Sequence, residues 1–220
     1  MTKVTKDAKQ KLWKEKLKEL DKIVDNEGTP IDENIKETVA AFNLNGFPTI
    51  KSCGGHTWND HLSFPFVLGR AFGMPENRFT SDKKIRERIA LAHHTIPEEI
   101  EINPSAADEY DQLIEKLGLH ETREYQEWDG RNEVLRRSLE LLLKEFYQNR
   151  KVARDAKLYS AQPMLGFLIT AGRRETKDKI KEHKIKTKEI AEFQKTIIAA
   201  QGEMNAFAEF LKDKFFNSGK

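Results

Sequence analysis

The stretch GFPTIKSCGGHTW, residues 46–58, holds the side chains best suited to chemistry. Cys53 is the single cysteine of the chain; two glycines follow it, and His56 comes next. A thiolate is a strong nucleophile, and a nearby histidine can take up the proton of the thiol. Cys53 and His56 are therefore the candidate catalytic residues.

The residues around this pair are candidates for ligand binding. Two successive glycines permit a sharp turn and can direct several backbone N–H groups toward one anion. Because loops at strand ends commonly carry function, we expect both catalytic candidates to share one concave site with Ser52 and Gly55. We also expect a positive φ at Gly55. The candidate ligand-binding residues are Thr49, Ser52, Gly54, Gly55 and His61.

Two other interpretations of the loop stay open. Cys53 and His56 have the spacing of two zinc ligands, but a structural zinc site needs four and the chain has no second cysteine. A zinc site is therefore the weaker interpretation, and the sequence predicts no metal ligands. In the other interpretation Cys53 is a small buried apolar residue and the glycines only form a turn. The missing zinc ligands would have to come from Asp60, His61, His93 and His94.

The composition sets the class of protein. With 220 residues, of which 38% are hydrophobic, the chain can bury a sizeable core. The 38 basic and 36 acidic side chains nearly cancel, so only a local basic patch could bind nucleic acid. One cysteine permits no internal disulfide, and no window approaches the roughly 20 apolar residues of a membrane span. We expect a cytoplasmic protein without a membrane partner. The candidate patch consists of Arg136, Arg137, Lys144, Arg150, Lys151 and Arg154.

The apolar spacing predicts an α+β fold with a small mixed or antiparallel sheet flanked by helices. Asp32 is placed to cap the start of the helix that ends near Gly46. Gly118 is placed to close the helix at 110–117. The strand that begins at Thr49 is expected to pair with the strand at 62–72 across the cysteine loop. Helices are predicted at 3–25, 33–46, 86–94, 110–117, 131–151 and 175–216, and strands at 49–50, 62–72, 98–103, 122–128 and 164–172.

The C-terminal helix carries a heptad seam of about three repeats. An exposed apolar stripe of this length needs a cover, so we expect it to associate with the body of this chain or with a second copy in a homodimer. The predicted domains are an α+β domain at 1–172 and this long helix at 173–220. The seam consists of Ile190, Phe193, Ile197, Ala200, Met204, Phe207 and Leu211.

Residues 17–56 resemble the N-terminal part of the wybutosine-synthesis tRNA methyltransferase family, which carries a Ser-Cys-Ser-Gly-Arg signature at this place. Ser52, Cys53 and Gly55 match the signature, whereas Gly54 replaces its second serine and His56 replaces its arginine. The resemblance implies an RNA substrate and S-adenosylmethionine as methyl donor. The missing arginine argues against tRNA methylation itself.

The chain is more similar to uncharacterised bacterial and phage proteins with a Gly-[Phe/Ile]-x-Thr-x-x-Ser-Cys-x-Gly-His motif, followed by an aromatic-rich strand that begins at a proline. Here the motif runs from Gly46 to His56, and the strand begins at Pro65. This second resemblance implies a shared site and an α+β fold, and it names no reaction.

Three functions follow as hypotheses. The first is a nucleotide- or RNA-related enzyme or binding protein that holds a small polar ligand or RNA at the cysteine loop. The second is a cysteine-dependent hydrolase or transferase with Cys53 as nucleophile and His56 as base, for which the sequence shows no third, orienting group. The third is a non-catalytic module that binds a partner through its C-terminal helix.

Overall fold

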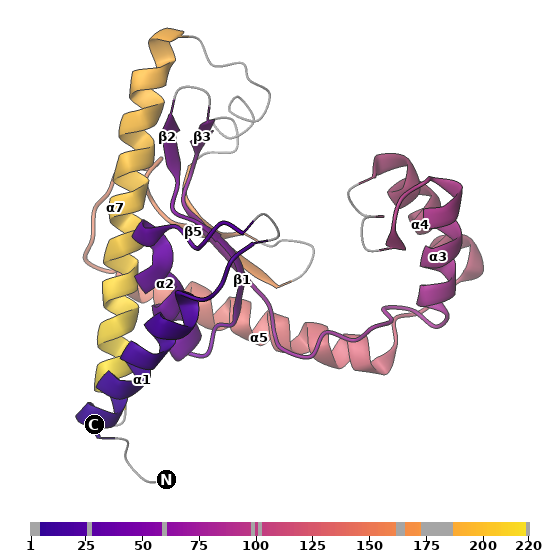
Figure 1. The fold of residues 1–220 in the computed structure, drawn as a ribbon, viewed down its shortest axis with the longest axis horizontal. Coiled ribbons are helices and arrows are strands. Elements are labelled where there is room, and N and C mark those ends of the chain that lie inside the picture. Colours follow the sequence, from indigo (N-terminus) through magenta and orange to yellow (C-terminus); the bar gives the residue numbers. More distant parts are fainter. Residues whose placement is uncertain are drawn as a thin grey trace. The chain divides into compact units, whose positions relative to one another are not determined.

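The computed structural model describes residues 5–25, 28–58, 61–97, 100, 103–161, 166–172 and 187–218. The chain divides into two compact units, which are considered separately below (Figure 1). The first unit combines Met1–Arg70 with Asn132–Lys220, and the second is Ala71–Arg131. The boundary expected at residue 172 does not coincide with this division, because the C-terminal helix belongs to the first unit.

Two short helices open the first unit. Helix α1, Lys6–Leu20, begins after Thr5, whose hydroxyl accepts a hydrogen bond from the N–H of Ala8 at 3.3 Å. This helix is shorter than the predicted span of 3–25. Helix α2, Glu33–Leu44, buries Val39 and Phe42 in the core and agrees closely with its prediction.

The described residues of the first unit form a four-stranded antiparallel sheet, with the strand order β1-β4-β6-β5. Strand β1, Thr49–Cys53, pairs with β4, Phe66–Gly69, so the predicted pairing across the loop is confirmed. Strands β5, Tyr159–Ala161, and β6, Phe167–Thr170, complete the sheet.

The strand predicted at 62–72 proved to be two strands. Strand β3, His61–Ser63, pairs with β2, His56–Trp58, in a small separate hairpin, and β4 begins only at Phe66. Pro65 lies between β3 and β4; it has no N–H to donate to a strand ladder, which explains the interruption.

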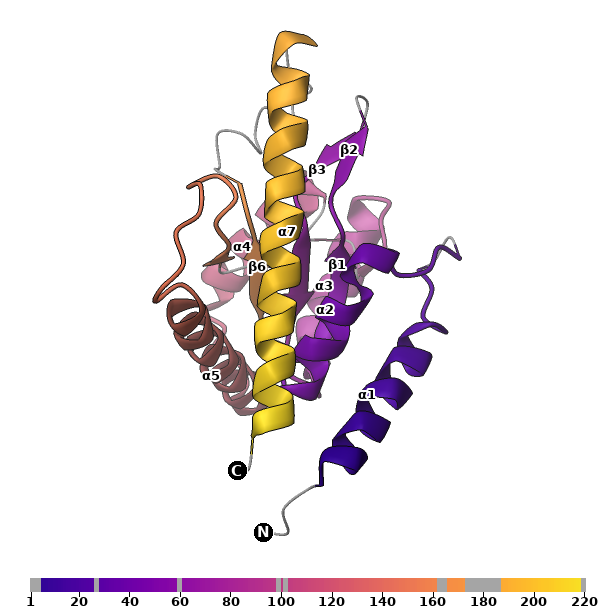
Figure 2. The same ribbon diagram turned by 90° about the vertical axis from the view of Figure 1, so that its left-hand side faces the viewer.

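Helix α7, Thr187–Asn217, belongs to the first unit and runs beside α2 (Figures 1 and 2). Its seam is buried in the core of its own chain: Ile197, Phe207 and Leu211 are fully buried and Met204 is 1% exposed. Phe207 contacts the rings of Phe42 and Phe146, with centroids 5.9 and 5.2 Å away. Of the two covers expected for the seam, the structure has the intramolecular one.

The C-terminal end of α7 is held by a buried lysine of α1. The ammonium group of Lys9 donates hydrogen bonds to the carbonyl oxygens of Phe215 at 2.6 Å and Ser218 at 2.5 Å. The last carbonyls of a helix have no partner within the helix, so a cation here satisfies them and also complements the helix dipole. Helices α1 and α7, far apart in sequence, are thereby tied together.

The second unit is built from helices α3, Asp82–Ala92, and α4, Pro104–Leu117, with the first turns of α5, Arg123–Phe146. Gly118 closes α4 with a φ of 59°, as predicted. The buried carboxylate of Asp82 accepts a 2.6 Å hydrogen bond from the hydroxyl of Tyr110, and burial raises the pKa of that tyrosine above its usual range.

Of the two strands predicted in the second unit, one proved to be helical and the other lies largely outside the described residues. Residues 123–128 of the segment 122–128 lie in α5, where Tyr125 and Trp128 are three positions apart and both buried, as the period of a helix requires. In the segment 98–103, Ile100 lies in a short 3₁₀ turn, and residues 98, 99, 101 and 102 lie outside the described residues.

The fold class is therefore α+β, as the sequence predicted, with a small antiparallel sheet and a long C-terminal helix. Among the described residues, no helix has both the length and the apolar character needed to cross a bilayer.

Candidate functional site

The loop of interest joins the sheet to the small hairpin. Strand β1 ends at Cys53 and β2 begins at His56, so only Gly54 and Gly55 lie between them. The φ of Gly55 is +83°, which confirms the predicted positive value. A methyl group at this position would lie 3.1 Å from the Pro65 ring and 3.2 Å from the carbonyl oxygen of Ser63.

Gly55→Ala should lower the free energy of unfolding of the first unit by about 2–5 kcal/mol. The left-handed backbone costs an alanine about 1–2 kcal/mol, and the tight contact with Pro65 adds about 1–3 kcal/mol. Urea unfolding measures the loss. Gly28→Ala is the control, because Gly28 has a φ of +81° with nothing within 4 Å of its added methyl. Equal losses in the two variants would show that the contacts at Gly55 do not matter.

The backbone N–H groups of the loop are already engaged within the protein. Gly54 N–H donates to Oδ2 of Asp32 at 2.8 Å, Gly55 N–H to Sγ of Cys53 at 3.4 Å, and His56 N–H to Oγ of Ser63 at 3.1 Å. None of these three donors is directed at an external anion. The phosphate or oxyanion cradle expected from the two glycines is therefore not formed.

The carbonyl oxygens of the loop are held by helices α2 and α7. Nε2 of Gln201 donates to the carbonyls of both Gly54 and Gly55 at 2.9 Å, and Nδ2 of Asn34 donates to Gly54 at 3.0 Å. Nε2 of Gln194 donates to Thr57 at 2.6 Å. Neither glutamine was predicted from the sequence to contact the loop. The available signal was their spacing of seven residues, which places both on one side of the apolar seam.

Three side chains of different types meet at this loop. The possible ligand atoms of Asp32, Cys53 and His56 all lie within 4.8 Å of one another, and each residue is half-buried. Asp32 had been assigned only a capping role. It does stand at the N-cap of α2, but its side chain makes no capping hydrogen bond and reaches Gly54 instead.

The other neighbours of Cys53 and His56 are a hydroxyl and an aromatic ring. Oγ of Ser63 lies 3.6 Å from Sγ of Cys53, a contact that the sequence analysis did not foresee. The imidazole of His56 stacks on the indole of Trp58, with centroids 5.2 Å apart and an angle of 19° between the planes. Trp58 is 64% exposed, so an aromatic surface lies beside the reactive side chains.

Several sequence candidates lie elsewhere. Thr49 is at the opposite end of β1 from Cys53, where its hydroxyl accepts a hydrogen bond from Asn43 at 3.1 Å. Ser52 precedes Cys53 in the strand, so the two side chains leave from opposite faces. The backbone of His61 pairs with that of Trp58 in the hairpin, and the structure does not describe the side chain of His61.

The remaining candidates for zinc ligands lie outside the described residues or in the second unit. Asp60 lies outside the described residues. His93 and His94 belong to the second unit, where Nε2 of His93 lies 2.7 Å from a carboxylate oxygen of Glu109.

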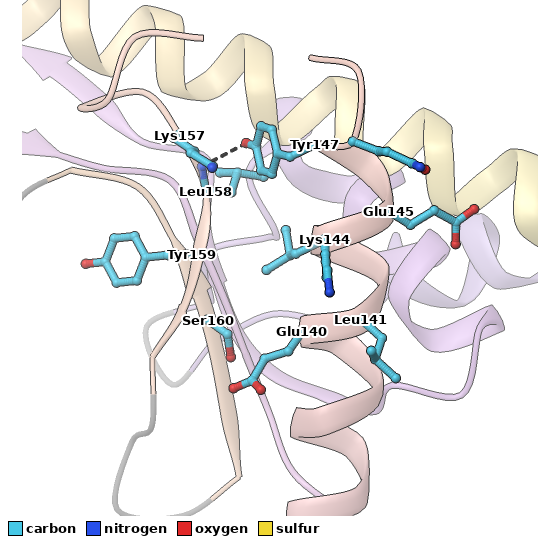
Figure 3. Close-up of a pocket in the computed structure, with 11 residues that line it drawn as sticks. Glu140, Leu141, Lys144, Glu145, Tyr147, Lys157, Leu158, Tyr159 and Ser160 are labelled. Atoms are coloured by element: carbon cyan, nitrogen blue, oxygen red, sulfur yellow. Dashed lines mark hydrogen bonds between the residues drawn. The ribbon is translucent and has the colours of Figure 1, made fainter. Parts of the chain in front are cut away.

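A groove of about 850 Å³ lies elsewhere in the first unit, between α5 and β5 (Figure 3). The hydroxyl of Tyr147 in this groove accepts a hydrogen bond from the N–H of Leu158 at 2.9 Å and donates one to Glu203 at 3.2 Å. Its lysines, Lys144 and Lys157, lie among tyrosines and glutamates, and the group of possible metal ligands found among the described residues is not in this groove. We therefore take the cysteine loop, and not this groove, as the candidate site.

The candidate basic patch is partly neutralised. Arg136 and Arg137 both pair with Glu133, and Arg150 pairs with Glu203 at 2.8 Å. Paired guanidinium groups offer less to a phosphate backbone than free ones. The patch alone therefore gives weak support for RNA binding.

Comparisons with protein families, with curated proteins and with solved structures found no match to this chain.

Proposed function

We propose that the protein is an enzyme whose substrate carries a nucleobase, as a nucleotide or RNA does. The substrate binds at the loop between β1 and β2. The observation that carries this proposal is the exposed indole of Trp58, stacked on His56 next to Cys53 and Asp32. Aromatic side chains bind bases by stacking, and each stacked base contributes about 1–3 kcal/mol.

Recognition through the base fits this loop better than recognition through phosphate. The N–H groups of Gly54, Gly55 and His56 are occupied, so the loop offers no backbone cradle to an anion. The adenine of S-adenosylmethionine, the donor implied by the sequence resemblance, presents the same kind of flat ring. Nucleotides, RNA and this donor are therefore alternatives for a single stacking surface.

A cysteine-dependent hydrolase or transferase is a second candidate. Asp32 supplies the third polar group that the sequence did not reveal, within 4.8 Å of the cysteine and histidine atoms. The N–H of Gly55 donates a hydrogen bond to Sγ of Cys53 at 3.4 Å, which helps to fix the position of the sulfur atom. Against an acyl-enzyme mechanism, none of the three loop N–H groups is left to stabilise an oxyanion.

Fluorescence titration tests the proposal, because Trp58 is the exposed tryptophan while Trp13 and Trp128 are 7% and 0% exposed. Adenosine, AMP, S-adenosylmethionine and a short single-stranded RNA are the ligands to compare. We expect saturable quenching by at least one of them. Trp58→Leu should weaken its binding roughly 5- to 150-fold, the equivalent of about 1–3 kcal/mol, when followed by calorimetry.

Trp58→Phe is the matched control, because it keeps an aromatic face and should retain most of the affinity. If none of the four ligands binds, or if Trp58→Leu binds as tightly as the unaltered protein, the nucleobase proposal is wrong. Stoichiometric labelling of Cys53 by a substrate-like electrophile, without nucleobase binding, would instead favour the cysteine-dependent enzyme.

A further inference from the structure

We infer that Asp32, Cys53 and His56 bind one divalent metal ion of the zinc class and leave one coordination position open. The inference rests on the proposed function only in using the same reactive centre. The metal could be bound whether or not a nucleobase is the substrate.

The geometry of the three side chains supports a shared ion. Ligand atoms around tetrahedral zinc lie about 3.3–3.8 Å apart, given bonds of about 2.0–2.3 Å. The three atoms here already lie within 4.8 Å of one another, so movements of about 1 Å or less bring them to these separations. Side-chain rotations alone provide movements of this size.

The three ligands come from three different elements. Asp32 stands at the start of α2, Cys53 at the end of β1, and His56 at the start of β2. A cluster assembled from separate elements is held by the fold and not by a single flexible loop.

The donor types select the metal. A thiolate and an imidazole favour zinc or cobalt over magnesium or calcium, which prefer oxygen ligands. Three protein ligands and one open position are the arrangement of catalytic zinc sites, whereas structural sites have four protein ligands. The open position would hold a water molecule, whose acidity the metal increases.

The hydrogen bonds around the cluster are those that metal ligands require. Oδ2 of Asp32 is fixed by the N–H of Gly54 at 2.8 Å, while the other oxygen has no hydrogen-bond partner among the described residues. Sγ of Cys53 accepts the N–H of Gly55 and lies 3.6 Å from Oγ of Ser63. Such outer contacts orient the ligands of a metal ion.

The direction of the Asp32 side chain also fits a bound cation. An aspartate at an N-cap normally accepts a hydrogen bond from the first turn of its own helix. Here the carboxylate forgoes that bond and turns toward Cys53 and His56 instead. A carboxylate near a thiol and an imidazole is well placed when a cation lies between them.

Cobalt(II) titration of the full-length, metal-stripped protein tests the inference. We expect a thiolate-to-cobalt charge-transfer band and intense visible bands of four-coordinate cobalt, saturating at one ion per chain and displaced by zinc. Cys53→Ser should abolish the charge-transfer band. Asp32→Asn and His56→Gln should each weaken cobalt binding about 100-fold or more, and Ser63→Ala about tenfold, because outer contacts typically contribute 10- to 100-fold.

Asp213→Asn and His94→Gln are matched controls outside the cluster and should bind cobalt as the unaltered protein does. Circular dichroism confirms that each variant is folded. Absence of the charge-transfer band in the unaltered protein overturns the inference whatever the variants do. Cobalt binding that persists unweakened in folded Asp32→Asn also overturns it, since the ion would then use another set of ligands. The titration contains no nucleobase, so its result is independent of the test with Trp58.

Discussion

Ile197→Asp should unfold the first unit at room temperature, whereas Ile198→Asp, at the next residue of the same helix, should leave its melting temperature nearly unchanged. Ile197 is fully buried in the α7 seam and Ile198 is 58% exposed. Burying isoleucine contributes about 1.5–3 kcal/mol, and an unpaired buried carboxylate costs several kcal/mol more. The total approaches the 5–15 kcal/mol by which whole domains are stable.

Thermal melting by circular dichroism, together with light scattering for the molar mass, measures both variants. The pair is well matched, because residue type, helix and introduced charge are the same and only burial differs. A folded Ile197→Asp protein with half the mass of the unaltered one would show that the seam joins two copies. Equal melting temperatures of the two variants would contradict the intramolecular packing of α7.

The parts of the fold that the sequence predicted correctly are those encoded by short-range patterns. The apolar period of α2, the β-branched residues of β1 and the glycines before His56 lie within about 25 consecutive residues, and each indicated its own structure. The seam of α7 was equally visible, because Ile197, Met204 and Leu211 repeat every seven residues. The sequence left open which of two partners covers that seam.

The centre of the candidate site could be predicted only in part. Cys53 and His56 stand out by their types, but Asp32 lies 21 positions before Cys53 and also suits the helix start that it occupies. No residue near Asp32 in the sequence indicated that its carboxylate would make no capping hydrogen bond to α2. Gln201 was still more remote: it reaches the loop only because α7 packs along α2. Contacts of this kind depend on tertiary packing, which a pattern in one sequence does not specify.

The two glycines of the loop do not leave their backbone free for a ligand. They were expected to leave backbone N–H groups free for an anion, but Asp32, Cys53 and Ser63 accept those hydrogen bonds. Gly54 instead permits close packing, because a methyl group there would lie 1.8 Å from the side-chain oxygen of Asn34. The same residue types thus serve a rigid loop that positions side chains, and not a loop that binds through its backbone.

The central claim is that Asp32, Cys53 and His56 act as one centre, and protection of the single thiol by zinc tests it most directly. If the apparent binding free energy is about 10 kcal/mol, at the low end for structural zinc, the dissociation constant is roughly 50 nM. About 5 μM free zinc then leaves roughly 1% of the thiol uncoordinated, so alkylation should slow about 100-fold.

The measurement is the rate of iodoacetamide labelling of Cys53 at neutral pH, by mass spectrometry, with and without zinc. We predict strong protection in the unaltered protein and in Asp213→Asn. In Asp32→Asn, which keeps both Cys53 and His56, we predict labelling within about twofold of the rate without zinc, because binding about 100-fold weaker leaves at least about half of the thiol free. A labelling rate that zinc does not change in the unaltered protein, or equal protection in folded Asp32→Asn, would contradict the claim that the three residues form one centre.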